Sequence, residues 1–477
     1  MSKLFYRFRK TQNIFDFKEL ENQEIYFASN EELNDPMEGF KNLVFNGDKI
    51  VWRNLFKHYL LCFEFMYQTY LICGESHAKF EIDLIPIFRN SDDIETLKYK
   101  ELFKKIYLET FEIYGQIIDK IATRTTPILK EELFKYLYPF HMIALEIIQR
   151  NYESEGLIPK RENALDIQNF IEQDNIKLID VVEAMIQEHG QEKMDKFLRA
   201  TSFFYEEFNF VQSINLKHTP NKLFLLNFPQ NYLRAIEKLT YPKNYVACFT
   251  GEDAINNSSV WGHYGDSHKG VCLIFKTNKH FGLSLCKKEN FYSYNKFNSD
   301  NLQEGIEKVK SFYKLEKIKY TSSFPEIDFF RSLGRLPIPK LNATWYKDDD
   351  KKLSDIHSEV FTDEEKWRNG YWNKYSQNNL IKTKDWAYED EYRLILNSGI
   401  DGEIDKEYRI LKYDFQNMQG LIFGINTTNE DKIKIFEIIQ KKCAEYKRKD
   451  FELFQAYYCN TNKNIQFKKF RISIGGN

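Results

Sequence analysis

The stretch Tyr245-Val-Ala-Cys-Phe-Thr250 marks the point at which this sequence changes from a helical pattern to a pattern of strands. Aromatic and β-branched side chains favour extended backbone, and Gly270-Val-Cys-Leu-Ile-Phe275 repeats the same composition after a polar segment. The chain beyond these two runs predicts a helix at 430–447 and further strands at 391–396, 420–425, 452–458 and 465–470. The last two strands are expected to pair with each other.

The beginning of the chain has the same mixed character. Residues 4–9 alternate apolar and polar side chains, residues 25–28 form a second β-prone run, and a helical turn at 15–20 separates them. Ser29 or Asn30 can cap a short helix, which the turn-forming residues after it would stop. Both ends of the chain therefore predict a domain that contains helices and strands.

Between the two ends, residues 48–240 follow a helical period. Apolar side chains recur every three or four positions in five segments, at 51–73, 98–122, 129–152, 164–173 and 192–210. We therefore predict an α+β protein with a mixed or antiparallel split sheet. Its domain is assembled from residues 1–47 and 241–477, and a large all-helical insertion interrupts it.

Charge and cysteine usage exclude several classes of protein. The chain has 68 basic and 70 acidic residues, so no overall field attracts nucleic acid or anionic lipid. Its seven cysteines are scattered without a C-x-x-C pair, which argues against a disulfide framework and a cysteine-rich zinc site. The first ten residues, MSKLFYRFRK, lack the apolar region of a secretory signal. We expect a cytoplasmic protein.

One apolar stretch, residues 51–74, has the length of a membrane span. It contains Arg53, Lys57, His58 and Glu64, whose burial in lipid would be costly. The stretch therefore predicts a buried helix, and we expect no association with a membrane.

The segment 386–396 carries the most distinctive polar residues. If it is extended throughout, Glu389, Glu391 and Arg393 lie on one face of a strand. Two neighbouring carboxylates tend to raise the pKa of one of them, which suits acid/base chemistry or the stabilisation of a cation. The structural alternative is an ion-pair network in which both glutamates pair with Arg393, Arg7 or nearby lysines.

A second polar motif, Trp261-Gly-His-Tyr-Gly-Asp-Ser-His268, combines aromatic rings with two histidines. His263 can titrate near neutrality, and Trp261 and Tyr264 can stack on an adenine or nicotinamide ring. The structural alternative is a rigid turn with a buried tryptophan and a hydrogen-bonded histidine. A metal site on His263, His268 and Asp266 is not expected, because nothing in the sequence fixes their geometry.

Five motifs in this order resemble the bacterial domain-of-unknown-function 2971 family. They are Phe5-Tyr-Arg-Phe8, Tyr26-Phe-Ala-Ser29 with Leu33-Asn-Asp-Pro-Met-Glu38, Cys248-Phe-Thr250, Trp261-Gly-His-Tyr-Gly265 with His268-Lys-Gly-Val-Cys272, and Trp386-Ala-Tyr-Glu-Asp-Glu-Tyr-Arg393. The resemblance covers the first forty residues and most of the chain from 245 to 470, and it leaves the insertion unexplained. The family name implies no reaction, so the chemistry has to come from the residues.

The Glu-x-Glu of residues 389–391 also resembles the catalytic strand of ADP-ribosyltransferases. The resemblance implies NAD as substrate and a nucleotide-binding site. In that case Glu391 holds the nicotinamide-ribose hydroxyl and stabilises an oxocarbenium-like transition state, while Glu389 activates the acceptor.

By the same resemblance, Arg7 corresponds to the arginine that binds NAD. Ser29, which follows Tyr26 and Phe27, corresponds to a serine on the second strand. The chain departs from the pattern because it has Phe-Ala-Ser where those enzymes prefer Ser-Thr-Ser. We nevertheless expect Arg7, Ser29, His263 and Glu391 to converge on one cleft.

Three functions from different classes follow. The first is an ADP-ribosyltransferase-like effector, in a bacterial toxin or phage-defence setting, whose acceptor is a protein or a nucleic acid. The second is a non-enzymatic module that senses a nucleotide or a partner. The third is a ribonuclease acting through the insertion, because Arg53 and His58 resemble the Arg-x4-His signature of the ribonucleases called HEPN. The insertion is also a candidate surface for a partner protein.

Overall fold

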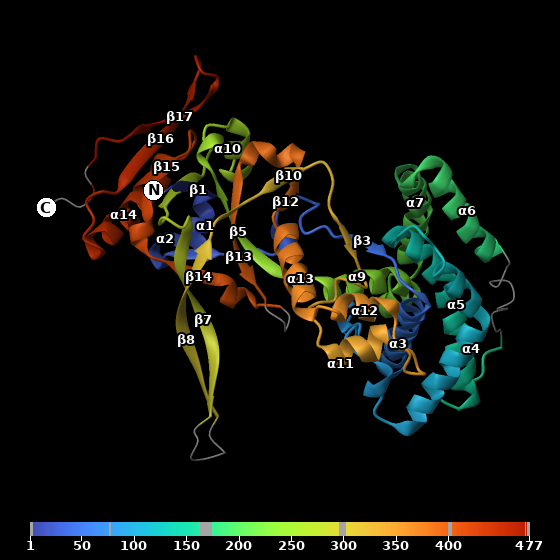
Figure 1. Ribbon diagram of the computed structural model, residues 1–477. Helices are drawn as coiled ribbons and strands as arrows, with labels where there is room; N and C mark the ends of the chain where they lie inside the picture. Colours follow the sequence, from blue (N-terminus) through green and yellow to red (C-terminus); the bar gives the residue numbers. More distant parts are fainter. Residues whose placement is uncertain are drawn as a thin grey trace. The chain divides into compact units, whose positions relative to one another are not determined.

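The computed structural model describes residues 3–75, 78–162, 174–294, 302–398, 403–472 and 474 (Figure 1). The chain divides into two compact units. Unit 1 consists of Met1–Phe40, Pro242–Phe324 and Ser376–Asn477, and unit 2 consists of Lys41–Tyr241 and Pro325–Tyr375. The predicted α+β class is confirmed, with mixed and antiparallel sheets.

Unit 1 is built on an eight-stranded sheet in which strands from both ends of the chain alternate. The order is β17-β16-β15-β6-β1-β5-β13-β9. The strands are β1 (Leu4–Arg9), β5 (Asn244–Thr250), β6 (Val271–Lys276), β9 (Glu316–Lys317), β13 (Glu391–Asn397), β15 (Met418–Phe423), β16 (Glu452–Cys459) and β17 (Asn464–Lys469). The predicted strands at 4–9, 245–250, 270–275, 391–396, 420–425, 452–458 and 465–470 are therefore confirmed, and the last two pair as expected, in the antiparallel direction.

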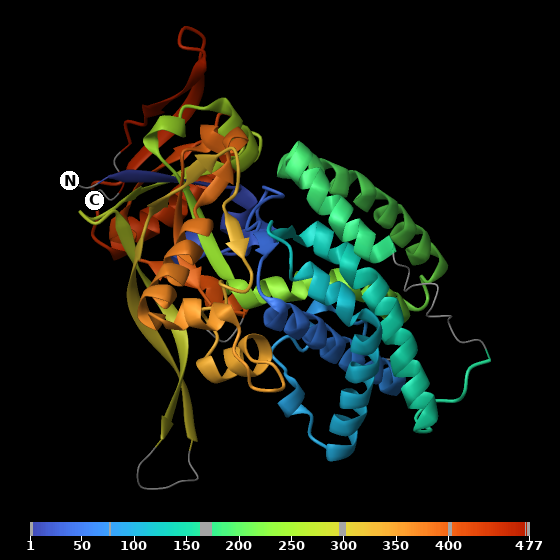
Figure 2. The same cartoon turned by 45° about the vertical axis from the view of Figure 1, so that its right-hand side comes forward.

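A second sheet of unit 1 has the order β2-β14-β7-β8. It contains β2 (Glu24–Tyr26), β14 (Ile410–Tyr413), and the two 13-residue strands β7 (Gly282–Tyr294) and β8 (Leu302–Lys314). β7 and β8 run side by side as a long hairpin in both views (Figure 2). A short parallel pair, β10 (Lys319–Thr321) and β12 (Ile381–Thr383), completes the strands of unit 1.

The two faces of the eight-stranded sheet carry different cores. One face packs Phe5, Phe249, Tyr392 and Leu394 with the second sheet and with α14 (Asn429–Glu445). The other face packs Tyr6, Phe8 and Ile274 against Trp261 of α10 (Ser258–Tyr264). Side chains alternate between faces along a strand, so these two cores decide the face on which each polar side chain lies.

The remaining helical elements of unit 1 are short. They are α1 (Thr11–Asp16), α2 (Glu19–Asn22), η1 (Asn30–Glu32), η5 (Glu252–Ala254), η7 (Lys384–Glu389), η8 (Lys406–Arg409) and η9 (Phe415–Asn417). The N-cap residue of η1 is Ser29, one of the two residues that were predicted to cap a short helix here. The segment 386–396, predicted to be extended throughout, is instead a 3-10 helix up to Glu389 and a strand from Glu391.

Unit 2 is mainly a bundle of long helices. These are α3 (Lys49–Cys73), α4 (Leu97–Ile121), α5 (Lys130–Ser154), α6 (Asp174–His189), α7 (Gln191–Asn215), α8 (Pro220–Leu226) and α9 (Phe228–Thr240). The predicted helices at 51–73, 98–122, 129–152 and 192–210 are confirmed, while the one at 164–173 lies outside the described residues. Figure 2 shows α3, α4 and α5 packed along one another.

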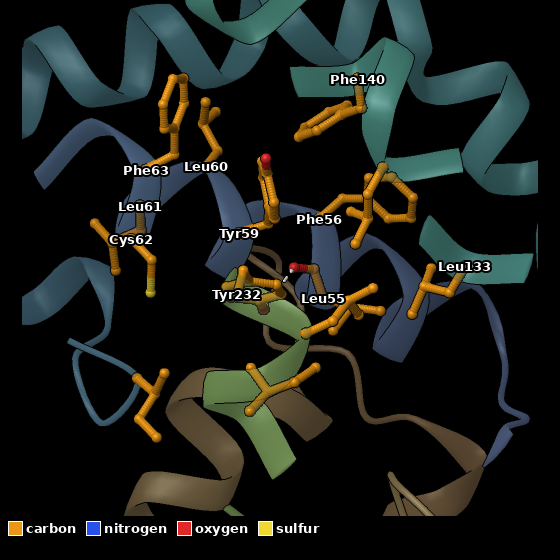
Figure 3. Packing of buried hydrophobic residues seen from close by; sticks show 14 of the residues in the cluster. Leu55, Phe56, Tyr59, Leu60, Leu61, Cys62, Phe63, Leu133, Phe140 and Tyr232 are labelled. Atoms are coloured by element: carbon orange, nitrogen blue, oxygen red, sulfur yellow. Dashed lines mark hydrogen bonds between the residues drawn. The ribbon is translucent and has the colours of Figure 1, made fainter. Parts of the chain in front are cut away.

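The core of unit 2 is rich in aromatic side chains (Figure 3). Phe56 of α3 meets Phe140 of α5 edge to face, with ring centroids 4.9 Å apart. Tyr232 of α9 packs on Tyr59 at 4.9 Å, and its hydroxyl donates to the carbonyl oxygen of Leu55 over 3.5 Å. The burial of this face confirms that the apolar stretch at 51–74 is a core helix.

Residues 325–375 belong to unit 2, although their position after residue 241 assigned them to the α+β part. The segment β11 (Glu326–Asp328) pairs in parallel with β3 (Asn42–Phe45), which also pairs with β4 (Ile128–Leu129). The insertion is therefore not purely helical. The same segment contains α11 (Ile338–Leu341), η6 (Asn342–Tyr346), α12 (Asp355–Phe361) and α13 (Glu364–Asn378) up to Tyr375.

Two 3-10 turns, η2 (Ile82–Leu84) and η3 (Ser91–Asp93), connect α3 to α4. Within the described ranges, no helix combines the length and apolar character that a membrane crossing needs.

Candidate functional site

Five charged side chains of unit 1 lie buried together where β13 begins. They are Glu38, Lys382, Glu389, Glu391 and Arg393, and we call them the carboxylate cluster. The side chains of Glu391 and Arg393 point away from the core that holds Tyr392 and Leu394. The cluster therefore lies on the face of the sheet that also carries α10.

Glu391 is held by two cations. Arg393 donates from Nε to Oε1 over 2.7 Å and from Nη2 to Oε2 over 3.1 Å. Lys382 Nζ donates to Oε2 over 3.2 Å, and the backbone N–H of Glu391 donates to the hydroxyl oxygen of Tyr320 over 2.9 Å. Only 4% of Glu391 is exposed, so these contacts are shielded from water.

Glu389 shares Lys382 with Glu391. Lys382 Nζ donates to Glu389 Oε2 over 2.7 Å, and the hydroxyl of Tyr264 donates to Oε1. The two glutamates meet at one ammonium although they do not follow each other along one strand. Asp390 between them has φ 42°, a left-handed turn, and this turn replaces the expected strand alternation.

The tight packing of Gly251 fixes this turn. Its N–H donates to the carbonyl oxygen of Asp390 over 2.9 Å. A Cβ atom at Gly251 would lie 1.9 Å from the carboxylate of Asp390, so only glycine fits here without a shift.

The surroundings separate the pKa values of the two glutamates. Burial would raise the pKa of Glu391, but the charges of Arg393 and Lys382 outweigh it and lower the pKa to about 2. Burial and the charge of Glu391 together raise the pKa of Glu389 by more than Lys382 and Tyr264 lower it. At neutral pH Glu391 is firmly ionised, whereas Glu389 takes up a proton more readily than an ordinary glutamate.

Arg393 links the cluster to the beginning of the chain. Its Nη1 and Nη2 donate to the two carboxylate oxygens of Glu38 over 2.6 and 2.7 Å, a bidentate pair. Glu38 comes from the Leu33-Asn-Asp-Pro-Met-Glu38 motif, one of the five motifs that carry the family resemblance. With all five groups ionised, the cluster holds three carboxylates and two cations.

A partly exposed aromatic group lies beside the cluster. His263 Nδ1 is 2.9 Å from the hydroxyl oxygen of Tyr388, and the rings of Tyr388 and Trp386 are 6.2 Å apart at 30°. The ammonium of Lys382 lies 4.6 Å from the centre of the Trp386 ring. His263, Tyr264, Glu389 and Glu391 are thus brought into one neighbourhood through Tyr388 and Lys382.

Trp261 does not belong to that partly exposed group. It is fully buried, packs edge to face on Phe8 at 4.8 Å, and donates from Nε1 to the carbonyl oxygen of Ile255 over 2.8 Å. Its ring therefore belongs to the core and cannot stack on a ligand. Trp386 is the half-buried tryptophan next to His263.

Arg7 lies on the opposite face of the sheet from Glu391. Its neighbours along β1, Tyr6 and Phe8, point to the α10 face, so Arg7 points to the other core. There it donates to the carbonyl oxygen of Tyr26 over 3.3 Å and lies 5.6 Å from the ring of Phe249. Burial lowers its pKa to about 10. The expected convergence of Arg7 with Glu391 is not found.

Tyr26 and Ser29 take part in a local network. The hydroxyl of Tyr26 donates to Glu32, and the N–H of Ser29 donates to Glu32 Oε2 over 2.9 Å as part of a capping box. Ser29 thus begins η1. The structure does not bring either residue into the contacts of the carboxylate cluster.

Arg53 and His58 of α3 have separate surroundings. Arg53 forms a bidentate ion pair with Asp119 at 2.7 and 2.9 Å. His58 is buried, with Nδ1 2.8 Å from the hydroxyl of Tyr232 and Nε2 3.0 Å from the carbonyl oxygen of Ile87, and burial lowers its pKa to about 4. The arrangement does not present the two side chains together to an RNA backbone.

Three residues in or beside the carboxylate cluster were not identified from the sequence. Lys382 and Tyr320 lie on short strands with no distinctive motif, and Tyr388 stood out only as part of a longer aromatic run. The pattern did suggest that Arg393 and a lysine would pair with the glutamates. Within the described part of the chain, no group of three or more His, Cys, Asp and Glu is placed to hold a metal ion.

Comparison with known proteins covers one part of the chain. The family described as "Protein of unknown function (DUF2971)" matches residues 260–394. This range contains Tyr264, Lys382, Glu389, Glu391 and Arg393, so the predicted resemblance is confirmed for this segment. No significant match was found among curated proteins or among solved structures.

Proposed function

We propose that unit 1 is an NAD-using, ADP-ribosyltransferase-like enzyme that acts on the bond between ribose and nicotinamide. The observation that supports the proposal is the charge of the carboxylate cluster, in which three carboxylates face two cations. In a buried site, one excess negative charge stabilises a positively charged species. The ribosyl group becomes such a species as the bond to nicotinamide breaks.

The pKa of Glu391 is lowered and that of Glu389 is raised, and this difference gives each glutamate a separate role in the proposal. When the bond between C1′ and the nicotinamide nitrogen breaks, its electron pair passes to the nicotinamide, which leaves as a neutral molecule. Ionised Glu391 contributes the charge that stabilises the ribosyl cation. The acceptor then attacks C1′ and loses its proton to Glu389, whose raised pKa makes it a stronger base than an ordinary glutamate.

The partly exposed aromatic group supports the binding of a flat ligand. His263, Trp386 and Tyr388 present rings beside Lys382, and aromatic faces of this kind stack on heterocycles such as nicotinamide or adenine. Arg7, Tyr26 and Ser29 have no part in this proposal, because their contacts lie elsewhere in unit 1.

The test is the release of nicotinamide from NAD by the purified full-length protein, measured by chromatography. We expect release by the wild type and its loss in Glu391→Gln and Glu389→Gln. Glu430→Gln is the matched control, since Glu430 forms an exposed pair with Lys434 on α14. Circular dichroism of each variant separates a loss of chemistry from a loss of fold.

A second candidate is a module that binds a nucleotide without turnover. The hydrogen bonding of Glu391 favours this binding module, because both carboxylate oxygens of Glu391 already accept hydrogen bonds from Arg393 or Lys382. A wild type that binds NAD by calorimetry but releases no nicotinamide would favour this candidate over the enzyme.

A further inference from the structure

The helix α7 of unit 2 packs one of its sides against neighbouring helices. Tyr205 of α7 meets Phe134 and Tyr138 of α5 edge to face, with ring centroids 5.0 and 5.4 Å apart. Met194 and Leu198 belong to a small core that α7 shares with α6. These contacts fix which side of α7 is turned away from the bundle.

The side of α7 that is turned away is rich in exposed phenylalanines. Between 48% and 72% of each ring is exposed, and Val211 and Ile214 on the same helix are 50% and 55% exposed. We call these seven residues the α7 face. Its five phenylalanines are Phe197, Phe203, Phe204, Phe208 and Phe210.

The α7 face has the period of a helix that packs against a second helix. One stripe advances by alternate steps of three and four residues, and all six of its members are exposed. Five of the six are apolar, and Glu207 is the exception. The stripe consists of Phe197, Ala200, Phe204, Glu207, Val211 and Ile214.

The area of the α7 face matches one half of a protein interface. At about 200 Å² for a whole aromatic side chain, the five rings expose roughly 600 Å². The two aliphatic residues add to this area. A monomer rarely exposes a continuous apolar patch of more than a few hundred Å², whereas a standard interface buries about 800 Å² of each partner.

The charges of α7 differ between its two halves. The half before Phe204 has three basic and two acidic residues, and its basic residues include Lys196 and Arg199. The half from Phe204 onwards has two acidic residues, Glu206 and Glu207, and no basic one. Two copies of α7 that run antiparallel therefore place the basic half of each helix opposite the acidic half of the other.

The same charges do not suit a lipid surface. A helix that lies on a membrane usually combines its apolar face with a polar face rich in lysine and arginine. The whole of α7 has three basic and four acidic residues, so anionic lipid does not attract it. The α7 face thus fits a protein partner better than a membrane.

We propose that the α7 face is the interface of a homodimer. In a two-fold symmetric dimer, the same surface of each copy meets the other, so one apolar stripe supplies both sides. The phenylalanines of the two antiparallel helices interdigitate, and Glu207 faces the basic half of the second copy. The proposal does not rest on NAD chemistry in unit 1.

Analytical ultracentrifugation of the full-length protein over a range of concentrations tests the proposal. We expect a wild-type dimer, and we expect Phe204→Glu to raise the Kd of dimerisation by about a hundredfold or more, because each dimer then buries two charges. Phe17→Glu is the matched control, since Phe17 is a 65% exposed phenylalanine of unit 1, and it should leave the Kd unchanged. Circular dichroism verifies the fold of each variant.

Glu207 tests the antiparallel direction and gives a variant that gains affinity. Glu207→Leu completes the apolar stripe and should lower the Kd by about tenfold. Glu207→Lys should raise the Kd, because the new lysine faces the basic half of the second copy. In a parallel dimer the two residues at position 207 face each other, so two lysines would repel as two glutamates do. An unchanged Kd in Glu207→Lys would therefore overturn the antiparallel arrangement.

Three further results would overturn the proposal. The first is a wild type that stays monomeric at concentrations on the order of 100 μM. The second is an equal Kd for the wild type and Phe204→Glu, which would place the dimer interface elsewhere. The third is a monomer that binds vesicles of phosphatidylcholine and phosphatidylserine and loses this binding in Phe204→Glu, which would assign the α7 face to a lipid surface.

Discussion

Lys382 holds two buried carboxylates with one ammonium group, and this sharing is what joins Glu389 to Glu391. Its Nζ lies 2.7 Å from one glutamate and 3.2 Å from the other, and the charges of both glutamates raise its pKa against the effect of burial. Without Lys382, both carboxylates would face each other with Arg393 as the remaining cation. The geometry of the cluster therefore depends on a residue that the sequence did not single out.

We expect Lys382→Met to destabilise unit 1 by roughly 3–5 kcal/mol, because removing one partner leaves buried charge uncompensated. Lys317→Met is the matched control. Lys317 pairs with Asp390 at 2.9 Å, but its side chain is 54% exposed, so its loss should cost less than about 1 kcal/mol. Chemical denaturation measures both values, and equal effects would contradict the description of Lys382 as a buried link.

The hydroxyl of Tyr264 gives a test of Glu389 that does not depend on stability. Its hydrogen bond lowers the pKa of Glu389, which burial raises. Glu389 must be ionised to act as a base, so activity should fall as the pH drops through its raised pKa. In Tyr264→Phe we expect this acid limb of the kcat/KM profile to move to higher pH. An acid limb that stays in place would remove Glu389 from the role of base.

At the scale of elements, Asp48 connects a helix to a segment about three hundred positions further along the chain. Its Oδ1 accepts from the N–H groups of Ile50 and Val51 and caps α3. Its Oδ2 accepts from the hydroxyl of Ser354 over 2.7 Å and the N–H of Asp355 over 2.6 Å, at the start of α12. One carboxylate thus serves two helix N-termini.

We expect Asp48→Ala to destabilise unit 2 by more than about 2 kcal/mol, since both sets of hydrogen bonds are lost. Thr96→Ala is the matched control because Thr96 caps α4, which has the same length of 25 residues, through one bond of 3.3 Å to Tyr99 N. It should cost about 1 kcal/mol. A cost for Asp48→Ala no larger than the control would contradict the double cap.

Elements with many periodic residues were predictable from the sequence, and short ones were not. The 25-residue helices and the strands at both ends follow their apolar periods, so burial of one face decides them. The turn at Asp390 was missed because a left-handed residue between two glutamates has no local sequence signal. The parallel pairing of β11 with β3 was missed because three residues cannot specify a partner so far away.

At the scale of the whole molecule, each unit is assembled from segments that are distant in sequence. The candidate site could be predicted as far as Glu389, Glu391, His263 and Tyr264, which stand in recognisable motifs, whereas Glu38 was part of a motif but was not assigned to the site. The sequence predicts that side chains alternate along β1, but it does not show which face of the strand packs against which core. The predicted position of Arg7 beside Glu391 was therefore wrong. The same limit applies to Trp261, because its motif is equally compatible with a ring that stacks on a ligand and with a ring buried in a core.

Unit 2 buries two neutral histidines, which links its stability to pH. Burial lowers the pKa of His58 to about 4 and that of His141 to about 3, from an ordinary value of 6.5. As the pH falls below 6.5, the unfolded chain binds protons that the folded chain excludes, so stability falls by up to about 1.4 kcal/mol per pH unit for each histidine. Urea unfolding at pH 7, 6 and 5 measures this slope.

His141→Gln should flatten that slope, while His218→Gln should leave it unchanged because His218 is exposed. An unchanged slope in His141→Gln would contradict the neutral state of the buried histidine.

The most direct test of the account is nicotinamide release from NAD by the wild type and by Glu391→Gln, each verified to be folded. Because Glu391 supplies the negative charge on which the proposed chemistry depends, we predict release by the wild type and none above background by the variant. Release at equal rates by both proteins, or by neither, would contradict the proposal that the carboxylate cluster is a catalytic centre.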